Sequence, residues 1–533
     1  MTRSRWGLIA LLTLAALVRL AGLHSQSLTM DECLEIELAQ RPLAEIIAAP
    51  NSFPPLYHIL LKLFMSIDPS LLAVRHFSVL CGLFAVLAMK RLGTEAVNAR
   101  TGWVAGVLAA VAPFHVYYSQ QGRGYMLIMG LASWALIYGL RLSREASWRD
   151  RLGFVLIAVA GGYTHYYFAV LLVAIACGVL AVRGLRFAVR ELLPLAAIIG
   201  LGCAPLLGLV RADLDYQKGI REARPMDVLS LGYTFFSFES GYTLGPSRRE
   251  LHHSDQRREL VRRALPLVAT VGIVAGGLLC LGTIRLVQVK EWPYWLMTLG
   301  VPFGVIGVLS AVCGVTYNTR FVVFCWMPYA LVTATALASL STRWLVPTSV
   351  ALLTIYGTAL YNRHAVPQYQ NEDTRGVARF LVAQPQRTVF ICAGYMDKSL
   401  RTYLPSPWQV VGLQDQGYPD GSPAQALEAL SDPPCWLVYV RPFHGDPEGV
   451  ILDTLRKHRG VQVVYQAAGV TVFDCGPLAL REGGARPSPT PDEAAARTLR
   501  TSGLPTSLAN THQRIPPARR AVAFERLSLI FIF

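Results

Sequence analysis

Long apolar runs, separated by short polar or basic connections, fill the chain from its first residues to about Tyr361. Many of these runs approach the roughly 20 residues that an α-helix needs to cross the hydrocarbon core of a bilayer. We therefore predict about 11 membrane-spanning helices, one for each run. The runs lie at 6–23, 71–89, 101–117, 125–141, 152–165, 167–182, 192–210, 264–284, 292–312, 321–340 and 344–361.

The composition agrees with a polytopic α-helical membrane protein. Of the 533 residues, 53% are hydrophobic and 16% are charged, and the mean hydropathy is +0.39. This balance is too apolar for an ordinary soluble enzyme. Much of the net charge of +15 falls in the short connections, so we interpret it as an orientation signal with contacts to anionic lipid. No nucleic-acid partner is expected.

Basic residues predict how the spans are oriented. Arg3 and Arg5 precede the first run and no small-residue cleavage site follows it, so we expect an uncleaved helix with its N-terminus inside. The later inside connections hold Lys90, Arg91, Arg100, Arg141, Arg144, Arg149, Arg151, Arg183, Arg186, Arg190, Arg285, Lys290 and Arg343. The opposite short connections hold few basic residues. An odd number of spans places the C-terminal region outside.

Two long outside loops, 24–70 and 211–263, interrupt the predicted membrane domain of residues 1–361. Within the first loop, residues 42–48 and 55–65 show helical apolar spacing behind a proline. This pattern predicts two short amphipathic helices that lie along the interface. Loops of this length commonly act as lids or binding segments.

The residues from 362 to 476 have the pattern of a soluble α/β domain, which the topology places outside. Helices are predicted at 373–383, 423–430 and 450–458, and strands at 388–393, 435–440, 461–465 and 470–474. The remaining residues, 477–533, are rich in Pro, Ala, Arg, Ser and Thr. They are predicted to form a disordered tail.

Asp31 and Glu32 form an acidic pair just after the first predicted span. Such a pair can be a solvated loop or a helix cap. Here it lies at membrane depth beneath the predicted amphipathic helices. Partial desolvation there would raise the pKa of a carboxylate and make it a stronger base. Asp31 is therefore a candidate reacting group.

Arginines occur at two positions on the outside face, which the positive-inside bias depletes of basic residues. Arg123 lies between two glycines, which would let a polar ligand approach the backbone, and Arg320 follows Asn318 and Thr319. Each arginine could simply reach the lipid headgroups. A guanidinium is also well matched to phosphate oxygens, and Lys62 could bind a lipid phosphate or a headgroup.

The order of these motifs resembles the bacterial family 39 glycosyltransferases of the GT-C superfamily, which are related to protein O-mannosyltransferases and lipid A aminoarabinose transferases. The matching elements are Asp31-Glu32, Pro54-Pro55-Leu56-Tyr57, Leu71 to Leu83 with Arg75, Tyr118 to Tyr125, Thr164-His165-Tyr166, Asn318 to Phe321 and Asp373-Thr374-Arg375. Two positions differ. Gln121 stands where many relatives have an acidic residue, and Phe53 stands where a histidine is common.

The resemblance implies a polyprenyl-phosphate sugar donor and a glycan, lipid or protein acceptor at the outer face of a bacterial cytoplasmic membrane. Asp31 would take the proton of the acceptor hydroxyl as its oxygen attacks the anomeric carbon with inversion, and Glu32 would position Asp31 or the acceptor. Arg123, Arg320 and Lys62 would bind the donor phosphate. Substrate contacts are assigned to Tyr57, His58, Gln121, Tyr125, His165 and Tyr166.

Two other classes of protein share some of these features. A transporter or flippase of polyprenyl-linked sugars would also place arginines near a lipid phosphate, but no internal repeat is visible and the polar motifs gather on one face. A catalytically inactive lipid-binding scaffold is the second alternative. No group of His, Cys and carboxylate residues has metal-ligand spacing, so no cofactor is assigned, and a divalent ion near Asp31 is left open.

Overall fold

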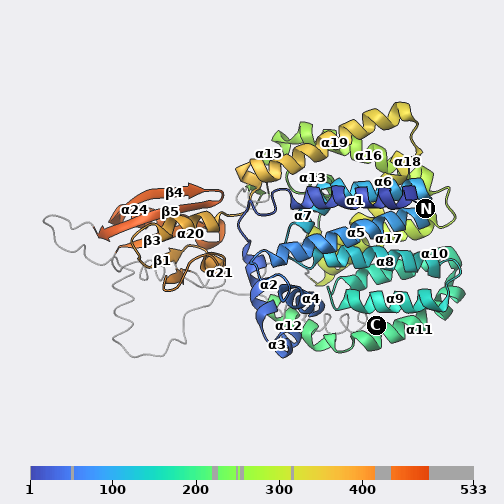
Figure 1. The fold of residues 1–533 in the computed structure, drawn as a ribbon, viewed down its shortest axis with the longest axis horizontal. Coiled ribbons are helices and arrows are strands. Elements are labelled where there is room, and N and C mark those ends of the chain that lie inside the picture. The colour runs from blue at the N-terminus through green and yellow to red at the C-terminus, as the bar shows by residue number, and fades with distance from the viewer. Residues whose placement is uncertain are drawn as a thin grey trace, which may run out of the picture.

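The computed structural model describes residues 2–49, 53–218, 226–247, 250–251, 257–313, 317–413 and 434–478. A body of helices precedes a small sheet domain, which lies beyond one end of the long helices (Figure 1). The helices of the body are α1 (Thr2–Leu20), α2 (Met30–Gln40), α3 (Leu43–Ala48), α4 (Leu56–Met65), α5 (Ala73–Ala96), α6 (Ala99–Val111), α7 (Pro113–Ser119), α8 (Tyr125–Leu142), α9 (Trp148–Gly162), α10 (Phe168–Arg183), α11 (Leu185–Cys203), α12 (Leu206–Lys218), α13 (Val228–Ser240), α15 (Arg257–Arg263), α16 (Leu265–Leu286), α17 (Trp292–Cys313), η1 (Thr319–Cys325), α18 (Trp326–Ser339) and α19 (Thr342–Ala365).

Each apolar run of the sequence coincides with a helix or a pair of helices. Among the described residues, six helices are long and apolar enough to cross a membrane, and α11 with the start of α12 forms a seventh candidate that bends by 65°. The six are α5, α8, α16, α17, η1 with α18, and α19. The polytopic helical architecture is thus confirmed, whereas the count of about 11 spans stays a prediction.

A proline explains why the run 101–117 is two helices. Pro113 has no N–H, so it cannot donate to the carbonyl of Ala109, and α6 ends. Arg19, which is fully buried in α1, donates instead to the carbonyls of Ala109 at 2.7 Å and Ala110 at 2.8 Å. The arginine that interrupts the first apolar run therefore fastens α1 to the break between α6 and α7.

The two ends of the helical body differ in character. At the end away from the sheet domain, basic connections form ion pairs between helices: Arg141 contacts Glu95 and Asp150, and Arg144 contacts Glu291 at 2.7 Å. The N-terminus also lies at this end (Figure 1). The opposite end carries α2, α3 and α4. This separation follows the alternation of the basic connections, and which end faces the cytoplasm stays a prediction.

The first long loop is more helical than the sequence analysis expected. The helices predicted at 42–48 and 55–65 are present as α3 and α4. The stretch that contains Asp31 and Glu32 was treated as a loop, and it is instead the first turn of α2. Thr29 caps this helix, accepting from the Glu32 backbone N–H, while the Glu32 side chain accepts from the Thr29 N–H. The second long loop, 211–263, likewise contains α13, α15 and most of α12.

The sheet domain contains η2 (Pro367–Tyr369), α20 (Thr374–Val382), β1 (Val389–Ile391), η3 (Gly394–Met396), α21 (Asp397–Arg401), β2 (Val410–Gly412), β3 (Cys435–Val440), α23 (Pro442–Gly445), α24 (Val450–His458), β4 (Arg459–Ala467) and β5 (Val470–Leu478). The strand order is β2-β1-β3-β5-β4. Strands β2, β1 and β3 are parallel, and β5 pairs antiparallel with β3 and β4. The predicted α/β domain is confirmed, but β2 and the short helices α21 and α23 were not predicted. The helix predicted at 423–430 and the tail beyond Leu478 lie outside the described residues.

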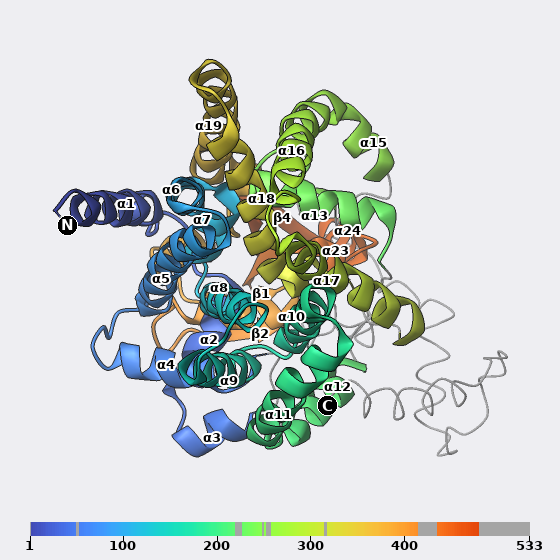
Figure 2. The same cartoon turned by 90° about the vertical axis from the view of Figure 1, so that its right-hand side faces the viewer.

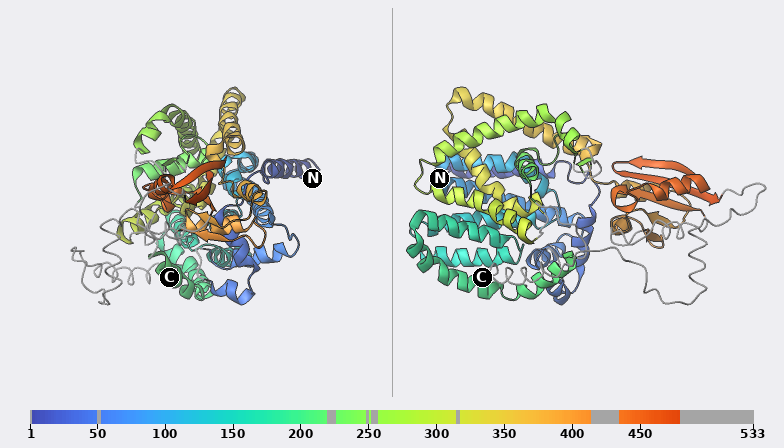
Figure 3. Two further views of the ribbon diagram at one scale, coloured as in Figure 1. Left: turned by 90° about the vertical axis from the view of Figure 1, so that its left-hand side faces the viewer. Right: turned by 180° about the vertical axis from the view of Figure 1, so that it is seen from behind.

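Alternate residues of the strands face opposite sides of the sheet. Val389 and Ile391 pack with α20 and α21, whereas Phe390 packs with α24. Figure 3 shows these helices on the two sides of the sheet.

The view along the long helices in Figure 2 places α2 and α4 beside α5, α8 and α9. Figure 1 shows α2 and α4 at the end of the helical body that the sheet domain adjoins.

Candidate active site

Three of the four carboxylates of α2 lie in its N-terminal half. Asp31, Glu32 and Glu35 occupy its first turn and a half, and the spacing of four residues puts Asp31 and Glu35 on the same side of the helix. Negative charge is also favourable at a helix N-terminus, where backbone N–H groups lack partners. The three side chains nevertheless have different surroundings, which assign them different tasks.

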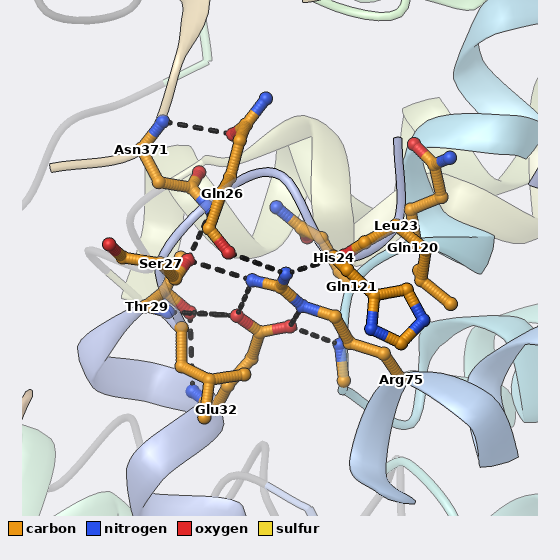
Figure 4. A network of polar contacts seen from close by, with 12 residues as sticks. Leu23, His24, Gln26, Ser27, Thr29, Glu32, Arg75, Gln120, Gln121 and Asn371 are labelled. Atoms are coloured by element: carbon orange, nitrogen blue, oxygen red, sulfur yellow. Dashed lines mark hydrogen bonds and ion pairs between the residues drawn. The ribbon is translucent and has the colours of Figure 1, made fainter. Parts of the chain in front are cut away.

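Glu32 is fully engaged in a buried network (Figure 4). Arg75 of α5 donates to both of its carboxylate oxygens, at 2.8 and 2.9 Å, and the backbone N–H of Gly122 donates at 2.8 Å. Burial alone would raise the pKa of Glu32, but the Arg75 guanidinium and the backbone donors outweigh it and lower the pKa. Glu32 thus joins α2, α5 and the loop after α7. Each of its carboxylate oxygens already accepts at least two hydrogen bonds from the protein.

Asp31 is the member of this group that is open to solvent, with 43% of its side chain exposed. Its oxygen pairs with Arg123, whose side chain is 13% exposed. Desolvation raises the pKa of Asp31, but the charges of Arg123, Arg320 and Arg441 together lower it to about 2. The raised pKa expected from the sequence is therefore wrong for Asp31 in this structure, because the arginine charges outweigh burial. The carboxylate is ionised over the physiological pH range, and part of it is exposed.

Glu35 is a third acidic member of the site, and the sequence analysis did not identify it. Its side chain is 2% exposed and is hydrogen-bonded to His58 Nε2. Its other oxygen lies 3.3 Å from Arg123 Nε. Arg123 therefore lies between Asp31 and Glu35. A signal for this residue was present in the sequence, because the capping box at Thr29 and Glu32 places position 35 one turn after Asp31.

Aromatic rings hold Arg123 from the other side. Its guanidinium lies 4.9 Å from the ring centroid of Phe53 and 5.7 Å from that of Tyr125. The sequence predicts that the glycines on either side of Arg123 leave space for a ligand, and this prediction is wrong. A Cβ on Gly122 would lie 2.5 Å from the Val74 side chain, and a Cβ on Gly124 would lie 2.9 Å from Phe53. The glycines are needed for close packing of the loop.

His165 and Arg320 complete the group around Asp31. The His165 ring meets Phe53 edge-on at 5.2 Å. Its burial, with the charges of Arg123 and Arg320, lowers its pKa to about 3, so the ring is neutral at physiological pH. Arg320 has no carboxylate partner among the described residues, and its Nε makes no hydrogen bond there. The structure thus brings together Asp31, Arg123, His165 and Arg320, which lie in four separate segments of the chain.

The other predicted contact residues are distributed around this group. Tyr57 and His58 are buried behind Arg123, Tyr125 contacts His165, and Gln121 donates to Tyr117 at 2.6 Å. Tyr166 adjoins His165 in the chain. Lys62 lies apart, because it donates to the carbonyl of Arg41 at the other end of α2, about 15 Å along the helix from Asp31.

Metal ligands do not gather in the described part of the chain. No group of three or more His, Cys, Asp or Glu side chains there is arranged to hold an ion. Near Asp31, the carboxylates instead neutralise arginines, since Glu32 pairs with Arg75 and Glu35 lies against Arg123. The site as described is one of carboxylates and guanidinium groups.

Comparison with known proteins places this geometry in context. A family model described as dolichyl-phosphate-mannose-protein mannosyltransferase matches residues 52–207. The structure of ArnT from Cupriavidus metallidurans bound to undecaprenyl phosphate superposes with a TM-score of 0.55 at 13% identity, covering 90% of this chain and 99% of that chain. The apo form of ArnT from the same organism gives a TM-score of 0.56 at 14% identity, covering 89% of this chain and 98% of that chain.

No curated protein sequence matches the chain significantly. The match to ArnT nevertheless extends through both the helical body and the sheet domain, because it covers nearly the whole of each chain. The resemblance drawn from the order of the sequence motifs is confirmed at this level. The chain is a polytopic membrane protein with the GT-C glycosyltransferase fold.

Proposed function

We propose that the protein transfers a sugar from a polyprenyl-phosphate donor to an acceptor hydroxyl, with inversion, at the outer face of a bacterial cytoplasmic membrane. The observation that carries this proposal is the exposed carboxylate of Asp31, which pairs with Arg123 and feels the charge of Arg320. A base and two phosphate-binding cations within one site are the groups that such a transfer needs. The GT-C fold and the match to ArnT support the same reaction class.

The reaction is a single displacement. The acceptor oxygen forms a bond to the anomeric carbon, the bond from that carbon to the phosphate oxygen breaks, and the lipid phosphate leaves with the bonding electrons. Asp31 takes the hydroxyl proton on the exposed side of its carboxylate. Arg320 and Arg123 stabilise the negative charge that develops on the phosphate.

The arrangement implies that Arg123 changes partner during turnover. In the structure its guanidinium is shared between Asp31 and Glu35. A donor phosphate would compete with Asp31 for the same N–H groups, because both are oxyanions that accept from arginine. Loss of that contact would raise the pKa of Asp31 and make it a stronger base when the donor is bound.

The remaining site residues have supporting tasks in this proposal. Glu32 fixes the start of α2 through Arg75 and does not take the proton. His165 is neutral and offers a hydrogen bond to the sugar rather than charge. Tyr57, His58, Gln121, Tyr125 and Tyr166 line or support the donor site. Lys62 binds a headgroup near the opposite end of α2.

The decisive experiment uses full-length protein in lipid nanodiscs with a radiolabelled polyprenyl-phosphate sugar and a cell-envelope extract as acceptor. Asp31→Asn should lower the transfer rate by about 100-fold or more, in line with the loss of a general base. Asp68→Asn is the matched control, because Asp68 lies in the same loop and pairs with His76 away from the site.

Unchanged transfer by Asp31→Asn would rule out this base. Absence of transfer by the unmodified protein, combined with movement of labelled lipid across the bilayer of proteoliposomes, would favour a transporter instead.

A further inference from the structure

The carboxyl ends of two parallel strands in the sheet domain carry polar and aromatic side chains. Tyr395 follows β1 and Arg441 follows β3, and because the strands are parallel neighbours their carboxyl ends share one edge of the sheet. Phe443 and His444 come directly after Arg441. In open α/β sheets this edge is where ligands usually bind.

Three contacts join this side of the sheet domain to α2, the helix that carries Asp31, and to the residues just before it. Lys398 of α21 pairs with Glu37 at 2.6 Å, and the Tyr403 hydroxyl accepts from the Leu28 N–H at 2.8 Å. Ser27 donates to Asp373, at the start of α20, at 2.8 Å. Arg441 is near enough for its charge to act on Asp31. The strand ends therefore lie on the side of the sheet domain that adjoins α2.

The backbone of Arg441 adopts an unfavourable conformation. Its φ of 46° lies in the left-handed region, which a residue with a long side chain rarely occupies. Such conformations persist where surrounding structure enforces them, and they concentrate at ligand sites. Here the conformation lets Arg441 Nε donate to Glu372 at 2.8 Å, with Arg441 Nη2 at 3.4 Å from the second oxygen.

The resulting set of side chains is neutral, planar and partly aromatic. Glu372 neutralises Arg441, whose side chain remains 26% exposed. The Arg441 guanidinium lies 5.7 Å from the ring centroid of Tyr395, and the Tyr395 hydroxyl lies 2.6 Å from His444 Nδ1. The rings of Phe443 and His444 are 4.4 Å apart.

A neutral Arg–Glu pair presents both donors and acceptors, which suits the adjacent hydroxyls of a sugar. Aromatic faces supply the apolar contact that ligand sites combine with a few polar groups. An extra anion would instead have to displace Glu372 from Arg441. The chemistry of this edge therefore favours a sugar ring over an anionic peptide or a lipid chain.

We propose that Glu372, Tyr395, Arg441 and Phe443 form a binding site for the acceptor, and that the acceptor is a glycan. The inference rests on the proposed function, because Asp31 is taken to activate the hydroxyl that this site presents. A sugar held at the strand ends would approach Asp31 from the sheet domain, whereas Arg123 and Arg320, which are proposed to bind the donor, belong to the helical body.

The test measures kinetics with the full-length protein in nanodiscs. Arg441→Gln and Phe443→Ala should raise the KM for the acceptor by about tenfold or more, with the KM for the polyprenyl-phosphate sugar unchanged. Arg441→Lys keeps the positive charge but lacks the planar guanidinium with its paired N–H donors, so its KM for the acceptor should be raised as in Arg441→Gln. Arg387→Gln is the control, because Arg387 pairs with Asp474 at 2.8 Å in the same domain and its side chain is 25% exposed.

The chemical nature of the labelled product provides a second criterion. Label in a protease-resistant glycan fraction supports the proposal, whereas label in protein or in a sugar-free lipid overturns it. A raised donor KM with an unchanged acceptor KM in Arg441→Gln would also overturn it, because Arg441 would then act on the donor.

A binding measurement separates failure of this inference from failure of the proposed function. Saturation-transfer NMR uses oligosaccharide released from the host cell envelope by mild acid, with no donor present. Binding that is lost in Phe443→Ala and kept in Arg387→Gln supports the glycan site even if no transfer occurs. Equal signals from Phe443→Ala and the unmodified protein would overturn it, even if transfer depends on Asp31.

Discussion

Arg75 and Glu32 form a two-bond ion pair in which both side chains are almost fully buried, at 3% and 2% exposure. Arg75 also donates to the carbonyls of Leu23, Gln26 and Ser27. One guanidinium thus holds both the loop before α2 and the first turn of that helix. Asp31 precedes Glu32 by one residue, so this pair determines where the proposed base lies.

Removal of one member of this pair should be severely destabilising. Glu32→Gln leaves the Arg75 charge buried without a counterion, and loss of one partner of a buried pair typically costs about 3–5 kcal/mol. We expect a lower melting temperature in detergent and a loss of transfer. Glu37→Gln is the control, since Glu37 is half-exposed on the same helix. Equal melting temperatures for the two variants would contradict a buried structural pair.

The pH dependence of transfer should report the Arg123–Asp31 contact. Arginine charges outweigh desolvation and lower the pKa of Asp31 to about 2, so its basic form is present above that pH and is lost as the pH falls through it. Activity should therefore show no acid limb from Asp31 above about pH 4. Arg123→Gln should raise this pKa and move the acid limb to higher pH.

The measurement is the pH profile of kcat/KM for the unmodified protein and Arg123→Gln, with Arg41→Gln as control because Arg41 is exposed at the far end of α2. An acid limb at the same pH in both proteins would show that Arg123 does not control the protonation of the base.

Gly122 should not tolerate a side chain. Its added Cβ would lie 2.5 Å from Val74, a buried β-branched residue that cannot move aside, and the Gly122 N–H donates to Glu32. We expect Gly122→Ala to lower the melting temperature and the transfer rate. Gly300→Ala is the control, because nothing lies within 4 Å of a Cβ there. Full activity of Gly122→Ala would contradict this account of the loop.

Two substitutions at Arg441 should separate backbone strain from side-chain function. Arg441→Gly and Arg441→Ala both remove the contact with Glu372, but only glycine occupies the left-handed region without a penalty. Arg441→Gly should be the more stable of the two by about 1 kcal/mol in thermal unfolding. Both should raise the KM for the acceptor to a similar extent. A more stable alanine variant would show that the left-handed backbone is not strained.

Much of the helical body could be predicted from the sequence, because a bilayer-length apolar run has few alternatives to a helix. The alternation of basic connections also indicated which loops meet, and it brought Arg123, His165 and Arg320 to the side of Asp31. The helix α2 was missed because its sequence mixes acidic and apolar positions without a clear period. The capping box at Thr29 was the available signal.

The partners of the site residues could not be predicted. Glu35 meets His58 across 23 positions, and Arg441 acts on Asp31 from a different domain. Contacts between distant segments depend on how the helices pack, which local patterns do not encode. Strand β2 was missed for a different reason. The equally short β1 lies within the apolar run 388–393, whereas β2 contains only Val410 and Val411 before Gly412.

The helix α2 belongs to two hydrophobic cores at once. Met30 packs into the core of the sheet domain, while Cys33 and Ile36 pack with α4 and α5. The sheet domain therefore cannot tilt away from the helical body without pulling on the turn that carries Asp31. Through α2, a shift of the sheet domain would change the distance between the carboxylate of Asp31 and the arginines of the helical body. A bulky acceptor that docks on the sheet domain would therefore alter the position of the proposed base.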